Sequence, residues 1–489
     1  PHHLTSRRRR PPQVTSRPLG MTKTRPAPPD SPQSSLHGLK PLTQQLRLRE
    51  FALVYVSYMC FLMGRKNYGF WLPSVIDVLG VSKAEAGLLG STQELVYGTC
   101  ALLNGVLIDM ASPKRILVAC LIATALLNLS IGSTESLPLM VLIWGGNGFV
   151  QSFGWPSISN IFLAWFPDPA SRGAWYSLLS TCQNAGAALV PLLISSVVAR
   201  VGWRGALYAP AVCCCCCAVV LTALLYGSPA VAQRYLSGQR AASTGKGHGV
   251  PQLPRGLARL LTQQVLLNRA LWLMALNYAA ISLVRTSLSD WSTVFLLEDK
   301  GLQMHEAARC LFLLETGGFV GSLAAGALSD RVFAGRRGPI VCTASLLIAP
   351  SLLGLLFAED VRLLSLCYAW LGFCAFPVHV LLGLFSREVV ASNVSSSAGG
   401  FVKAIAQIGG AFAGYPLGLL QQRAGWKGVF GFLASTVGAA AIATLPLWHT
   451  RAMVAREPLR CRNGTVADFE ELQKKYANGS QGKKLHKLS

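Results

Sequence analysis

Long apolar stretches alternate with short polar turns from about residue 50 to residue 448. A run of roughly 20 apolar residues can cross a bilayer as a helix, and the sequence contains twelve such runs. Irregular backbone cannot face lipid, because its polar groups would have no partners, so each run is predicted to be α-helical. The predicted spans are 50–76, 86–108, 115–133, 138–163, 174–198, 205–227, 270–297, 306–328, 339–357, 362–386, 395–420 and 427–448.

Polar segments divide these spans into two halves. Residues 228–268 have no apolar periodicity and are predicted to be a cytosolic linker between six-helix bundles at 49–227 and 269–448. Residues 1–48 are rich in Pro, Ser and Arg and are expected to be a disordered basic tail. A translated upstream region with the start at Met21 and a targeting peptide both fit that tail. Residues 449–489 are predicted to be a cytosolic C-terminal tail.

Composition supports a membrane protein. The chain of 489 residues is 52% hydrophobic and only 13% charged, about half the usual charged fraction of soluble domains. The formal net charge of +23 arises from basic residues in the tails, the linker and the even-numbered turns. This is the positive-inside pattern, which places both termini in the cytosol. The charge therefore needs no nucleic-acid partner to explain it.

The fourteen cysteines do not predict a metal or cofactor site. Five of them form the run 213–217 inside the sixth predicted span. Consecutive residues on a helix point in different directions, so these thiols cannot converge on one metal ion. They are interpreted as small buried hydrophobic residues.

Two pairs of landmarks reveal an internal repeat. The turn GVLIDMASPKR after the second span matches GALSDRVFAGRRG after the eighth, so that Asp109 and Asp330 are 221 residues apart. GWRG at residue 202 and GWKG at residue 425 precede the sixth and twelfth spans. The turns resemble the loop motif of the major facilitator superfamily. That resemblance implies that Asp109, Asp330 and Arg331 latch a cytosolic gate, with a purely topological role for their charges as the alternative.

The same offset relates charged residues inside the spans. Arg65 and Arg285 differ by 220 residues, and Glu94 and Glu315 differ by 221. A charge at mid-membrane costs at least about 2.5 kcal/mol on insertion scales, so each requires a reason. Two guanidinium groups, one from each half, predict an anion site, and their planar donors suit phosphate oxygens. The glutamates could hold the arginines in structural ion pairs or gate the transporter through interhelical contacts.

Lys403 breaks this symmetry, because the offset places it against Ser180. Its ammonium is predicted to face a cavity, with snorkelling towards water as the alternative. His379 is interpreted as a packed core residue, and Asp290 as a capping or a binding residue. Additional candidate substrate ligands, each supported only by its polarity or aromatic ring, are Gln183, Asn184, Tyr68, Tyr97 and Trp155.

Five segments carry a more specific resemblance over residues 50–448. They are GRKNYGFWLPSV, GWPS, GAWYSLLSTCQN, LVRTSLSDWSTVFLLEDKG and LETGGFVGSLAAGALSDR. They resemble the organophosphate:phosphate antiporter family, and in particular the glucose-6-phosphate:phosphate exchangers of eukaryotic endomembranes. The resemblance implies exchange of a sugar phosphate for inorganic phosphate by alternating access, with Arg65 and Arg285 as phosphate ligands. Bacterial glycerol-phosphate members carry His where this chain has Gln183 and Lys where it has Ala101.

The same resemblance favours the endoplasmic reticulum membrane, with the plasma membrane or a plastid envelope as alternatives, and the protein is expected to be a monomer. An ATP-driven pump is excluded, because Gly245-Lys246 lacks the earlier glycine of a phosphate-binding loop. A membrane enzyme is not expected either, since no Ser-His-Asp set or His-Glu metal cluster is evident. A sugar-phosphate sensor that kept the fold without transporting remains an alternative.

Overall fold

The computed structural model describes residues 40–109, 112–167, 169–236, 262–333, 336–390 and 394–450, and within these ranges the secondary structure is helical throughout. The described residues from Leu48 onward belong to one compact unit. The predicted tails lie largely or wholly outside the described residues. The helices of the first half are α1 (Lys40–Lys66), α2 (Tyr68–Leu79), α3 (Lys83–Asp109), α4 (Pro113–Gly132), α5 (Leu137–Gln151), α6 (Gly154–Trp165), α7 (Pro169–Val201) and α8 (Gly205–Leu224).

The second half begins after the predicted linker. Part of that linker is helical, since α9 (Pro229–Leu236) and a π-turn at Thr262–Leu266 fall within it. Residues 237–261 of the linker lie outside the described ranges. The helices of the second half are α11 (Arg269–Glu298), α12 (Met304–Arg331), α13 (Gly338–Phe357), α14 (Val361–Glu388), α15 (Ser395–Ala411) and α16 (Tyr415–Ala443), followed by a 3₁₀ turn at Leu445–His449.

All twelve predicted spans fall on helices of the described residues, but four of the spans are interrupted or bent. The first span is divided into α1 and α2, the fourth into α5 and α6, and the eleventh into α15 and the start of α16. The helix α16 then bends at Gly425, whose positive φ of 62° suits glycine, and the twelfth span ends at Ala443. The length of an apolar run does not reveal such breaks, because apolar residues flank each of them on both sides.

By length and composition, eight stretches of the described helices could cross a membrane, and one of them, Ser397–Ala443, combines the eleventh and twelfth spans. The first and fourth spans are divided into shorter helices, and the second contains the polar segment GSTQE. Spans that are broken or that carry polar side chains are therefore less uniformly apolar than the rest.

The break between α1 and α2 is stabilised by amide side chains from neighbouring helices. Asn128 on α4 and Asn147 on α5 each donate a 3.0 Å hydrogen bond to the carbonyl of Gly64. Asn67, at the break itself, donates to Asn128 Oδ1 at 2.8 Å and to the carbonyl of Ala206 at 2.9 Å. Non-helical backbone at membrane depth is tolerated where protein groups satisfy it in this way. The break therefore orients Arg65 and Lys66 at the end of α1.

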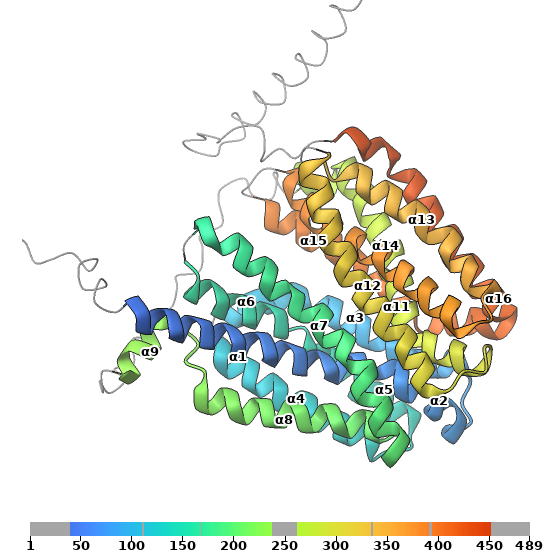
Figure 1. Cartoon of the computed structure of the whole chain (residues 1–489), viewed down its shortest axis with the longest axis horizontal. Helices are drawn as coiled ribbons and strands as arrows, with labels where there is room; N and C mark the ends of the chain where they lie inside the picture. The colour runs from blue at the N-terminus through green and yellow to red at the C-terminus, as the bar shows by residue number, and fades with distance from the viewer. Residues whose placement is uncertain are drawn as a thin grey trace, which may run out of the picture. The chain divides into compact units, whose positions relative to one another are not determined.

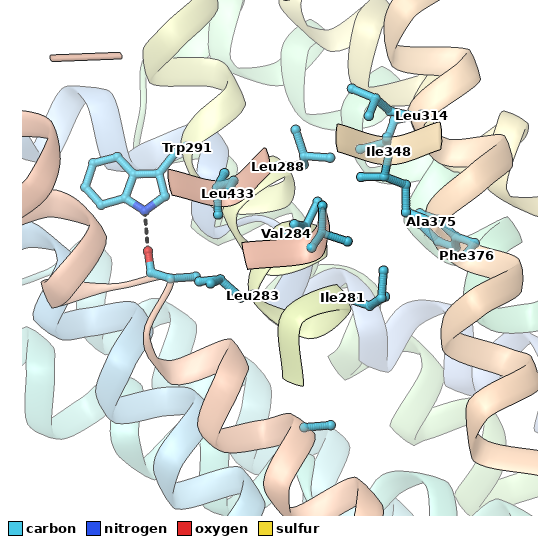
Figure 2. Close-up of a cluster of buried hydrophobic side chains, with 14 of the residues drawn as sticks. Ile281, Leu283, Val284, Leu288, Trp291, Leu314, Ile348, Ala375, Phe376 and Leu433 are labelled. Carbon is cyan, nitrogen blue, oxygen red and sulfur yellow. Dashed lines mark hydrogen bonds between the residues drawn. The ribbon is translucent and has the colours of Figure 1, made fainter. Parts of the chain in front are cut away.

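The two halves pack against each other through a limited set of helices. In Figure 1 the first half is coloured blue to green and the second yellow to red. Across the boundary α3 packs against α15 and α16, α7 against α12, and α2 against α11. In the core of the second half, Figure 2 shows α11 side chains beside residues of the surrounding helices, including Ile281, Val284, Leu288, Leu314, Ile348, Ala375 and Phe376. α11 is thus the central helix on which Arg285 is presented.

At the predicted outer face the halves approach backbone to backbone. A Cβ on Gly414 would overlap Gly87 and Ser91, and a Cβ on Gly69 would overlap the carbonyl of Ser289. Ser91 Oγ donates to the carbonyl of Ala411 at 2.6 Å and accepts from the Tyr415 amide at 2.9 Å. These contacts close the boundary between the halves on this side of the charged residues.

Two more contacts strengthen this closure. Lys83, at the start of α3, forms an ion pair with Glu298, at the end of α11. Trp291 on α11 donates a hydrogen bond of 2.6 Å to the carbonyl of Ala413, which satisfies one of the carbonyls at the break between α15 and α16 (Figure 2). We call this set of contacts, from Gly69, Lys83, Gly87 and Ser91 to Ser289, Glu298, Ala411 and Gly414, the outer closure.

Candidate functional site

Arg65 lies at the end of α1 among aromatic side chains of the first half. Its guanidinium is 5.0 Å from the centre of the Tyr97 ring, a cation–π arrangement. Tyr58, about two turns earlier on α1, also interacts electrostatically with Arg65. Trp155 packs edge-on against Tyr58, with ring centroids 5.3 Å apart. The structure therefore brings three predicted site residues, Arg65, Tyr97 and Trp155, into one cluster.

Arg285 occupies the corresponding place in the second half. Its guanidinium lies 4.0 Å from the centre of the Phe376 ring on α14. The Nε atom of Arg285 is buried and has no hydrogen-bond partner among the described residues. Each arginine thus rests on an aromatic ring, and the Arg285 fork keeps donor capacity for a ligand.

The arginines are close enough for their charges to interact, and the positive charge of Arg65 disfavours the positive charge of Arg285. Glu94 and Glu315 attract Arg285, and Glu94 attracts Arg65. Even so, neither arginine forms an ion pair with a carboxylate in the part of the chain that is described. Two neighbouring positive charges without direct carboxylate partners form an arrangement that an anion would stabilise.

Lys66 adds a third cation that the sequence reasoning missed. Its Nζ donates to Ser289 Oγ on α11 at 3.0 Å, which joins the two halves. Glu315 and Asp290 attract its charge. The sequence shows it as a second basic residue next to Arg65, but the repeat does not select it. Asp290, left open between capping and binding, belongs to this network beside Gly69 and Gly90.

The two predicted gating glutamates differ in their surroundings. Glu94 is half-buried, and its Oε2 accepts a 2.9 Å hydrogen bond from Gln407 on α15. This bond crosses from one half to the other. Glu315 on α12 is 6% exposed, and its main electrostatic partners are Lys66 and Arg285. Both carboxylates therefore lie at the boundary between the halves, where a gating role remains a prediction.

Lys403 shares one face of α15 with two residues that contact the other half. Gln407 is one turn further along α15 and contacts Glu94, and Gly410 lies beside the same carboxylate. Lys403 is exposed, and it makes no hydrogen bond or ion pair with any described residue. Its position fits the predicted orientation towards a space between the halves. Gln407 was missed because a neutral amide in a helix gives no charge signal.

Three other predicted ligands are placed differently. The Tyr68 hydroxyl donates to the carbonyl of Ala86 at 3.1 Å, and its ring stacks on Trp144 with centroids 5.8 Å apart. Its polar group is thus already used within the first half. Gln183 is exposed and Asn184 half-buried on α7, and no described contact joins either to the arginines. These three keep only the weak support that their polarity gave.

The predicted latch residues can be placed only in part. The side chains of Asp109 and Asp330 lie outside the described residues. Arg331 ends α12 and is exposed. Nearby, Arg337 lies 3.5 Å from Glu388 in an ion pair between the turn after α12 and the end of α14. The latch therefore stays a prediction.

The described cavities and metal-ligating residues do not define an alternative centre. A groove of about 690 Å³ follows the outer end of α7 and is lined mainly by leucine and valine, with Met63 and Arg200. None of the predicted ligands lines it. We therefore place the chemistry at the group of mutually interacting charges described above, called here the charged cluster, which consists of Arg65, Lys66, Arg285, Glu94, Asp290 and Glu315. Among the described residues, no group of His, Cys, Asp and Glu side chains could hold a metal ion.

Comparison with known proteins identifies the fold. The model of the Major Facilitator Superfamily matches residues 54–414. The chain belongs to the major facilitator superfamily. It is a multi-pass integral membrane transporter of that superfamily and not an enzyme. Its architecture of twelve transmembrane helices in two six-helix bundles is the major facilitator fold, as the sequence predicted.

Solved structures of major facilitator proteins share this architecture. The nucleoside transporter NupG superposes with a TM-score of 0.64 at 15% identity and covers 83% of this chain and 100% of its own. A bacterial homologue of the human lysosomal transporter Spinster, in an inward-facing and unoccupied conformation, gives a TM-score of 0.65 at 14% identity, covering 82% of this chain and 95% of its own. At these identities the likeness concerns the fold alone.

Relatives in sequence are phosphate-ester transporters and a sensor. A probable hexose phosphate transport protein of Chlamydia pneumoniae is 33% identical over 420 residues, which cover 82% of this chain and 91% of the relative. The membrane sensor protein UhpC of Salmonella typhimurium is 28% identical over 407 residues, with the same coverage. The glycerol-3-phosphate transporter of Bacillus subtilis is 27% identical over 417 residues, covering 83% of this chain and 93% of its own. This major facilitator protein is thus related to hexose-phosphate and glycerol-3-phosphate transporters.

Proposed function

We propose that this protein exchanges a sugar phosphate, such as glucose 6-phosphate, for inorganic phosphate by alternating access. The observation that carries the proposal is the pair Arg65 and Arg285. They come from different halves, interact electrostatically, and have no direct carboxylate partner among the described residues. A phosphate with nearly two negative charges would neutralise both.

Binding at this place would couple to the transport cycle. An anion held by one arginine from each half draws the halves together, so that occupancy favours the states in which the site can be occluded. The outer closure already holds α3 against α16 and α2 against α11 on one side. Rocking about the charged cluster would open that side and close the other. Tyr97 and Trp155 are proposed to line the site, while Glu94, Glu315, Asp109, Asp330 and Arg331 are proposed to control its gates.

Exchange in reconstituted vesicles tests this function. Vesicles are loaded with unlabelled phosphate, glucose 6-phosphate or sulfate, and entry of labelled phosphate is measured. Fast entry with the first two loads and none with sulfate is expected for an obligatory exchanger. Equal entry with all three loads, or no entry with any, would exclude phosphate-coupled exchange. Matched vesicles carrying the Arg65→Ala variant report leakage.

A non-transporting sensor of sugar phosphate is the second candidate function, favoured by the relation to a membrane sensor protein. The same charged cluster would then bind without turnover. Protection of the purified protein against thermal unfolding by glucose 6-phosphate, together with absent exchange, would indicate the sensor. We further propose a monomer with both termini in the cytosol and place it in the endoplasmic reticulum membrane, with the plasma membrane and a plastid envelope as alternatives.

A further inference from the structure

His379 lies beside the arginine of the second half. On α14 it follows Phe376 by three residues, so both side chains lie on one face of the helix. The guanidinium of Arg285 lies over the Phe376 ring. The charges of Arg285 and Lys403 both act on the His379 ring. The ring therefore lies close to these cations, and α14 presents it from the second half.

The histidine ring is held in place and is only partly satisfied. Tyr278 on α11 shares a 3.2 Å hydrogen bond with His379 Nε2, and the two rings meet edge to face with centroids 4.7 Å apart. The other ring nitrogen, Nδ1, is buried and has no hydrogen-bond partner among the described residues. Buried polar atoms are nearly always paired, because leaving one unpaired costs free energy. The packed-core interpretation of His379 leaves this atom unexplained.

Lys403 approaches the same layer from α15. Among the described groups that act electrostatically on His379 are Arg285, Lys403, Lys66 and Arg65, all of them cations. Tyr278 is seven residues before Arg285 on α11, two turns nearer to the predicted cytosolic face. His379, Tyr278 and Lys403 therefore form a layer of hydrogen-bonding groups adjacent to the arginines and displaced from them along the membrane normal.

We propose that His379, oriented by Tyr278, is a specificity-determining residue that binds a hydroxyl group on the organic part of the substrate. The proposal rests on the phosphate site proposed above. A phosphate ester held by Arg65 and Arg285 must place its substituent in a neighbouring layer. An imidazole nitrogen can donate to or accept from a hydroxyl, and a polar site of this kind rejects analogues that lack the hydroxyl. Inorganic phosphate has no substituent, so its exchange does not use this contact.

The experiment compares two substrates in the same vesicles. Vesicles loaded with phosphate take up labelled phosphate, and the concentrations of glucose 6-phosphate and of ethyl phosphate that halve uptake are measured. Ethyl phosphate serves as the probe that retains the phosphate ester but has no hydroxyl on its carbon chain. In the wild-type protein glucose 6-phosphate is expected to inhibit at a lower concentration. In His379→Leu this preference falls about 10-fold, the amount expected for one hydrogen bond, while phosphate self-exchange stays within about 2-fold.

His379→Gln and Tyr278→Phe extend the test. Gln keeps a donor and an acceptor, so it should restore part of the preference, whereas Phe removes the group that orients the ring and should lower it by a smaller factor. Tyr368→Phe is the matched control, because Tyr368 lies on α14 and is fully buried in the core of the second half. It should leave the preference unchanged.

The outcomes separate the two proposals. An unchanged preference in His379→Leu, or equal losses in preference and in phosphate self-exchange in both His379 variants, would overturn the specificity role. Loss of phosphate self-exchange in every variant of His379 and Tyr278 would also overturn it, since phosphate would then depend on the histidine. If the wild-type protein exchanged no phosphate at all, the proposed function itself would fail, and binding of the two esters measured by thermal protection would still report whether His379 selects between them.

Discussion

The outer closure and the charged cluster both lie at the boundary between the two halves but are built in different ways. In the outer closure, glycine lets backbones touch, and Ser91 uses its hydroxyl both to donate and to accept across the boundary. In the charged cluster, Arg285 Nε and His379 Nδ1 have no partner among the described residues, and the two arginines repel each other. The first region is complete without a ligand, and the second is not. We therefore expect the charged cluster to bind the substrate and the outer closure to open and close.

Replacing the arginines should have the largest effect on exchange, because it alters the charged cluster directly. Arg65→Lys and Arg285→Lys each keep the charge but lose the planar fork. Loss of one charge-assisted hydrogen bond of about 1.5–3 kcal/mol corresponds to a fall in phosphate exchange of roughly 10- to 100-fold. Exchange is measured at equal amounts of inserted protein, with Arg200→Lys at the exposed end of α7 as the control. Wild-type rates in both variants would contradict a shared phosphate site.

Adding a methyl group to the outer closure should give the next largest effect. Gly414→Ala places a Cβ against the Gly87 carbonyl and Ser91. Overpacking costs about 1–3 kcal/mol, so closure of this side becomes less favourable and exchange falls roughly 10-fold or more. Gly431→Ala is the control, because that glycine lies within α16, the helix that follows Gly414, and has open space at its Cβ position.

The site of action can be tested separately for this variant. The cysteine of a Ser289→Cys variant, within the outer closure, should react faster with a membrane-impermeant reagent from the predicted outer face when Gly414→Ala is present. The Lys66 hydrogen bond to Ser289 is lost in that background, so the comparison is made against Ser289→Cys alone. An identical labelling rate in the two proteins would mean that the methyl group does not open the closure.

The contrast between the regions also explains what the sequence could predict. The twelve spans and the two halves follow from apolar run length and a repeat near 221 residues, which depend only on sequence. The repeat also selected Arg65, Arg285, Glu94 and Glu315. The breaks at Asn67 and Gly414 could not be predicted, because they depend on amides, hydroxyls and indole groups of other helices.

Residues without a symmetric partner were harder to find. Gln407 and His379 are single polar residues whose significance appears only when their neighbours across the helix packing are known. Tyr68 shows the opposite case. The sequence predicts that its hydroxyl could bind substrate, but in the fold this hydroxyl donates to the carbonyl of Ala86. A polar side chain in a span therefore predicts that a partner exists, and the partner decides whether it is structural or functional.

Glu94 attracts Arg285 and also bonds to Gln407 in the other half. Its replacement should therefore affect exchange less than replacing an arginine. Glu94→Gln removes the charge from the bond to Gln407 while keeping its shape. Contributions of this kind to coupling amount to about 0.5–2 kcal/mol, so the maximal exchange rate is expected to change by roughly 2- to 30-fold, with little change in the phosphate concentration at half-maximal rate. Glu315→Gln should act in the same way, and Glu135→Gln, with its side chain 67% exposed, is the control. A change in affinity alone, at constant maximal rate, would show that these carboxylates belong to the binding site and not to the gate.

The smallest effect is expected at Lys403, which is exposed and interacts electrostatically with His379 beside the charged cluster. Its ammonium is exposed and has no partner among the described residues. Exposed charge interactions contribute about 0.2–1 kcal/mol, which corresponds to at most about a 5-fold change. Because Lys403 has no counterpart in the first half, we expect it to serve the asymmetric part of the substrate. Lys403→Ala should therefore weaken competition by glucose 6-phosphate about 3-fold and leave phosphate self-exchange unchanged, while Lys403→Arg keeps the charge and should restore competition. Lys427→Ala, an exposed lysine on α16, is the control. Equal losses in both measurements would make Lys403 a general electrostatic residue, and no loss in either would favour a side chain that simply snorkels to water.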